Sequence, residues 1–145
     1  MTRRTPLLGL LLSGFLAAAI TKDAVMAEPN LEKRSEKALQ YAEAQLEIAS
    51  KAYEQGETGT MKTSLDEVAA GARICLESLE ATGKDGRRNP KYFKRAEINM
   101  RKLLRKLENL RFAAAVDDRP PIDEVIHSAQ QVHEKILADI MSKDK

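Results

Sequence analysis

The sequence of 145 residues is poor in the residue types that cross-link, ligate or react, because it has one cysteine, two histidines and no tryptophan. A single cysteine, Cys75, cannot form an internal disulfide. The sequence contains no glycine-rich phosphate-binding loop, no paired zinc-ligand motif and no Cys-Xaa-Xaa-Cys-His motif for covalent haem attachment. No catalytic arrangement of its serines can be identified from the sequence. We therefore expect a protein that is not an enzyme.

Residues 1–27 have the composition of a secretory signal peptide. Two arginines near the start are followed by an apolar run from Leu7 to Ile20. This run is shorter than the roughly 20 residues that a membrane-spanning helix needs, so a cleaved leader is favoured over a retained anchor. Cleavage after Ala27 would leave small or short-branched residues at both recognition positions, and an earlier cut after Ala19 is the alternative. We expect a secreted or periplasmic protein without a transmembrane segment after cleavage.

Residues 28–145 form one expected domain with an uneven distribution of charge. They carry 21 basic and 21 acidic side chains, so the domain is neutral overall. The segment 84–111 holds eleven Lys or Arg residues against three acids, whereas 28–83 and 112–145 are both acidic. Export, neutrality and a basic segment with only two aromatic residues argue against nucleic-acid binding.

Four segments without internal proline, rich in Ala, Leu, Glu, Lys and Arg, predict four helices. The expected helices cover about 31–55, 60–82, 90–114 and 122–140. Asn30 and Asn89 stand at two expected N-caps, and Gly83 suits a left-handed C-terminal stop. Each helix has one apolar stripe, which favours an all-α, up-down antiparallel four-helix bundle made of two long helical hairpins. A pair of stacked hairpins is the alternative. The stripes include Leu39, Leu46, Leu65, Leu76, Met100, Leu107, Ile122 and Ile136.

The helix expected at 90–114 has a basic face opposite its apolar stripe. We take this face as the candidate binding site, with Lys94, Arg95, Arg101, Lys102, Arg105 and Lys106 as its residues. One interpretation is internal: an acidic stripe on the first helix, which includes Glu36 and Glu43, could pair with it across the bundle. The other is external: the face binds a protein or an anionic envelope component such as lipid headgroups or polysaccharide.

The two histidines differ in their expected positions. Glu124 and His127 have the Glu-Xaa-Xaa-His spacing of di-iron bundles, but both fall outside the apolar stripe and no second copy exists, so no metal site is predicted. His133 lies within the stripe, where a hydrogen bond to a carboxylate, a tyrosine or a carbonyl is expected. Ligation of haem or metal by His133, which would make the protein a redox bundle, is the alternative. No cofactor is otherwise indicated.

A few apolar residues fall away from the predicted core, and they could mark a homodimer or partner surface. Cys75 is expected to be a buried thiol at the edge of its stripe, with an intermolecular disulfide as the alternative. The leading hypothesis is therefore an exported, non-catalytic binding protein. The apolar residues that the helical pattern places outside the core are Tyr41, Ile48, Ile74, Ile98 and Phe112.

Overall fold

The computed structural model describes residues 20–142, and all regular structure in this range is helical. The predicted all-α class is therefore confirmed. The first 19 residues, which include most of the predicted leader, lie outside the described part of the chain. The elements are α1 (Lys22–Ala27), α2 (Leu31–Glu54), α3 (Thr58–Ala81), α4 (Pro90–Ala113), the 3-10 turn η1 (Val116–Asp118) and α5 (Pro120–Met141).

The ends of the long helices follow from local sequence. The Asn30 side chain accepts a hydrogen bond of 2.9 Å from the Lys33 backbone N–H and so caps α2, as predicted. Gly83 follows α3 with a φ of +66°, the left-handed conformation expected there. Asn89 does precede α4, but its side chain makes no capping hydrogen bond; Pro90 at the first turn fixes the start of this helix instead.

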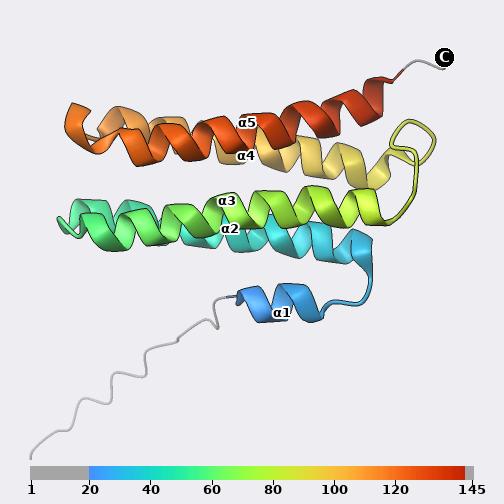
Figure 1. Ribbon diagram of the computed structural model, residues 1–145, viewed down its shortest axis with the longest axis horizontal. Helices are drawn as coiled ribbons and strands as arrows, with labels where there is room; N and C mark the ends of the chain where they lie inside the picture. Colours follow the sequence, from blue (N-terminus) through green and yellow to red (C-terminus); the bar gives the residue numbers. More distant parts are fainter. Residues whose placement is uncertain (1–19, 143–145) are drawn as a thin grey trace, which may run out of the picture.

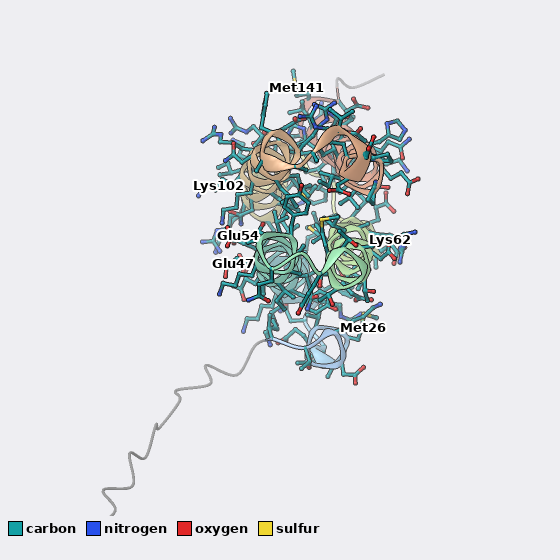
Figure 2. The ribbon with its side chains drawn as sticks, turned by 90° about the vertical axis from the view of Figure 1, so that its left-hand side faces the viewer. Met26, Glu47, Glu54, Lys62, Lys102 and Met141 are labelled. Carbon is teal, nitrogen blue, oxygen red and sulfur yellow. The ribbon has the colours of Figure 1, made fainter. Side chains whose placement is uncertain are left out.

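The four long helices form a bundle of two stacked hairpins (Figures 1 and 2). In one hairpin α2 packs on α3, and in the other α4 packs on α5. The hairpins meet with α2 beside α4 and α3 beside α5 (Figure 2). Since successive helices run in opposite directions (Figure 1), α2 and α4 run the same way. Because α3 neighbours α5 and α4 neighbours α2, the loop 82–89 connects two helices, α3 and α4, that lie diagonally opposite in the bundle.

The core lies between the hairpins, where the predicted stripes converge. The side chains of Leu65, Met100, Leu107, Ile122 and Ile136 are fully buried there. Burial of one such side chain is worth about 1.5–3 kcal/mol, and this makes the apolar stripes the main source of stability. Among the described residues no helix is both long enough and apolar enough to cross a bilayer.

The α2–α3 pair is the most closely packed in the bundle, because small residues face one another across it. A Cβ atom added to Gly71 would lie 2.8 Å from the Ala38 carbonyl oxygen and 2.9 Å from the Ala42 Cβ atom. Gly71 is therefore the point of closest approach between α2 and α3. Glycine at this position costs about 1 kcal/mol in helix propensity relative to alanine. Any side chain here would force the two helices apart, and glycine avoids this.

Two residues expected outside the core are buried, so this part of the sequence interpretation was wrong. Tyr41 is 5% exposed and Ile74 is 7% exposed. The reason is a second apolar layer on the outer side of α2 and α3, where α1 packs opposite the second hairpin (Figure 1). The pattern of each single helix could not reveal it. Ile48, Ile98 and Phe112 are exposed as predicted.

Replacement of Gly71 by alanine should destabilise the protein. The added methyl group meets backbone and Cβ atoms of α2, and overpacking of this kind costs about 1–3 kcal/mol, more than the gain in helix propensity. We expect a lower free energy of unfolding in urea titrations. Gly59→Ala is the matched control in the same helix, because a Cβ there meets nothing within 4 Å. Equal stability of the two variants would contradict the close-approach role of Gly71.

Candidate functional site

The six candidate residues of the basic face all lie on α4 and are all exposed. They fall into two groups of three according to whether an acidic side chain neutralises them. The first group is paired within the bundle and comprises Arg95, Arg101 and Lys106. The second group makes no ion pair with any described residue and comprises Lys94, Lys102 and Arg105.

Two of the paired residues connect α4 to the acidic stripe of α2. Arg95 Nη1 donates to Glu36 Oε1 at 2.7 Å, and Lys106 Nζ donates to Glu43 Oε1. These contacts cross the interface between the hairpins and confirm that α2 carboxylates complement the basic face. Each such exposed pair is worth about 0–1 kcal/mol. Their main effect is to favour α2 rather than another helix as the neighbour of α4.

A groove of about 470 Å³ separates α2 from α4 beside these ion pairs. Leu39 and Leu103 contribute apolar surface to it, and Glu36, Arg95 and Lys102 contribute charge. Lys102 projects from the same side of the bundle as Glu47 and Glu54 (Figure 2). The mixed charge of the groove gives it no clear preference for an anionic or a cationic small molecule.

The exposed side of α4 also carries two apolar residues whose relation to the cations the sequence analysis missed. Ile98, Arg105 and Phe112 are spaced by seven residues and so lie along one ridge of the helix. Ile98 is 43% exposed and Phe112 is 75% exposed. The seven-residue spacing was the available signal. We call Lys94, Ile98, Arg101, Lys102, Arg105 and Phe112 the α4 ridge.

Arg101 is paired within its own helix through Glu97, which also contacts α5. Arg101 and Glu97 form a two-point contact, with Nε 2.7 Å from Oε1 and Nη2 3.1 Å from Oε2. Glu97 Oε1 also lies 3.1 Å from His133 Nε2. Partial burial raises the pKa of Glu97, but the hydrogen bonds from His133 and Arg101 outweigh it and hold this pKa below its usual value.

His133 is hydrogen-bonded as predicted, and of the three expected kinds of partner it has a carboxylate, Glu97; it lies partly buried between α4 and α5. Ligation of haem or metal by His133 stays a prediction; ligation through Nε2 would break its contact with Glu97. Glu124 and His127 are both exposed, as expected. No three metal-binding side chains come together in the part of the chain that the structure describes.

Cys75 is buried in the core and is not in a disulfide. Burial raises the pKa of its thiol to about 12, because the apolar surroundings disfavour the thiolate. Since the thiolate is the reactive form, Cys75 is poorly suited to nucleophilic chemistry in the folded protein.

Glu97→Gln should lower the stability of the protein in a pH-dependent way. The folded-state pKa of Glu97 is depressed, so its stabilising effect is present above the usual carboxyl pKa and is lost as the pH falls through the folded value. We expect a difference from wild type of about 1 kcal/mol at neutral pH that shrinks toward pH 3, measured by urea unfolding. Glu108→Gln, on the same helix, is the control. A difference that does not change with pH would contradict this assignment.

Cys75 should react with a thiol reagent only when the protein unfolds. Burial blocks access, and the pKa of about 12 leaves almost no thiolate at pH 8. We expect no labelling of the native protein and complete labelling in denaturant, followed by absorbance of the released chromophore. Rapid native labelling, or a covalent dimer after mild oxidation without unfolding, would show that Cys75 is accessible.

No protein-family model, curated protein or solved structure matches this chain. The assignment of a function therefore rests on the residues and their geometry. The α4 ridge combines exposed cations with exposed apolar side chains.

Proposed function

We propose that this protein is an exported, non-catalytic binding protein whose α4 ridge associates with an anionic component of the cell envelope. The up-down helical bundle serves in this proposal as a rigid support for the ridge. The observation that carries the proposal is that Lys94, Lys102 and Arg105 are exposed and without ion pairs in the described structure, although acids are abundant elsewhere on the molecule.

Exposed Ile98 and Phe112 favour an anionic lipid surface over a soluble polyanion. An apolar side chain next to cations can enter the boundary between lipid headgroups and acyl chains, whereas a hydrated polysaccharide offers it little apolar contact. Each Lys or Arg near an anionic membrane contributes about 1 kcal/mol, and burial of a phenylalanine contributes about 1.5–3 kcal/mol. Together these terms suffice for reversible binding.

The proposal predicts that reversal of the three unpaired charges strongly weakens binding to anionic vesicles. The triple variant Lys94→Glu, Lys102→Glu, Arg105→Glu should bind vesicles of phosphatidylglycerol and phosphatidylcholine on the order of 100-fold more weakly. Sedimentation of the vesicles measures the bound fraction. Vesicles of phosphatidylcholine alone should bind neither protein.

The matched control reverses the same number of exposed charges on other helices, at Lys51, Lys62 and Lys135. The control changes the net charge by the same amount as the triple variant. A similar loss of vesicle binding in both variants would show that overall charge is responsible and would contradict a specific role for the α4 ridge.

Phe112→Ser separates the two kinds of anionic partner. It should weaken binding to vesicles and leave binding to an anionic polysaccharide unchanged.

A further inference from the structure

The short helix α1 lies at the boundary between the predicted leader and the domain. The Thr21 side chain accepts a hydrogen bond of 3.1 Å from the Ala24 backbone N–H and caps this helix. Val25, in the middle of α1, is fully buried. Ile20, just before it, is partly buried against the same core. Residues 20–27 therefore pack as part of the folded domain, although cleavage after Ala27 would remove them.

A polar contact joins α1 to both helices of the first hairpin. Lys22 Nζ lies 3.5 Å from Glu67 Oε2 on α3, and the Tyr41 hydroxyl of α2 donates to the same carboxylate oxygen. The three residues come from three different helices and meet at one carboxylate. This convergence lies on the outer side of α2 and α3, where α1 packs (Figure 1).

The contact lies on the second apolar layer of the fold, in which Val25, Tyr41 and Ile74 belong to the buried cluster. Without α1, this layer would lose its outer cover, and Glu67 would lose its lysine. Large apolar side chains stabilise a fold only while other groups shield them from water. The outer layer is thus complete only in a chain that retains residues 20–27.

We propose that the leader is removed between Ala19 and Ile20, so that α1 remains in the mature protein. Ala17 and Ala19 satisfy the small-residue rule for the third and first positions before the cut. A membrane-bound signal peptidase would hydrolyse the Ala19–Ile20 peptide bond with one water molecule. The carbon–nitrogen bond breaks, Ala19 gains the carboxylate and Ile20 gains the α-amine. This inference rests on the proposed export of the protein.

The exported full-length product, expressed with its own leader, tests the inference by intact mass and N-terminal sequencing. We expect an N-terminus at Ile20. An N-terminus at Glu28 would overturn this inference and leave the export proposal standing. Retention of Met1 in the exported protein would also overturn this inference alone, whereas absence of the protein from the exported fraction would overturn the export proposal.

Two matched substitutions locate the cut independently. Ala19→Arg should slow release of the leader at this site by roughly tenfold or more, because a bulky residue does not fit the position before the cut. Ala27→Arg, at the exposed end of α1, should leave processing unchanged. The reverse result, with only Ala27→Arg blocking processing, would overturn the proposal.

A third comparison tests whether α1 belongs to the mature fold. Val25→Asp places a carboxylate in the buried layer, and we expect the urea midpoint of the exported protein to fall by about 1 M. Met26→Asp is the control, since Met26 is exposed in the same helix. Equal midpoints for the two variants would show that α1 contributes nothing to the mature domain.

Discussion

The close approach of α2 to α3 at Gly71 determines how the rest of the molecule is arranged. Because small residues bring these backbones together, larger apolar side chains extend to both sides of the pair. On the inner side they meet the second hairpin and form the main core. On the outer side Tyr41 and Ile74 form a second layer, and α1 covers it. One tight helix pair therefore produces a fold with two apolar layers.

The second hairpin is attached less tightly, and charge has a larger part in its placement. Between α2 and α4 a groove remains, and long side chains cross it as the Arg95–Glu36 and Lys106–Glu43 ion pairs. Exposed pairs add little free energy, so the buried stripes hold the hairpins together. What the ion pairs add is selectivity, because the acidic stripe of α2 lies beside the basic helix that complements it.

Helical periodicity was sufficient to predict the four long helices and most of the core. In each helix the apolar residues, such as Leu65, Met100 and Ile136, recur at helical spacing on one face. It also predicted a hydrogen bond for His133, but left a carboxylate, a tyrosine and a carbonyl open as its partner. It failed for Tyr41 and Ile74, which belong to the same buried cluster as Val25 of α1, because α1 is a segment assigned to the leader. It could not indicate which cations of α4 are neutralised, since that depends on which helix lies alongside.

The division of the basic face has a physical consequence for any partner. Arg95 and Lys106 already donate to carboxylates of the same molecule, so an external anion would have to compete with a neighbour that is always present. Lys94, Lys102 and Arg105 have no such competitor in the described structure, and they stand beside exposed Ile98 and Phe112. A surface that combines unneutralised cations with exposed apolar side chains is most stable against an interface that is both anionic and apolar. Because the domain carries no net charge, only the α4 ridge is attracted to an anionic partner. The attraction therefore orients the ridge toward the partner and adds little long-range attraction of the whole molecule.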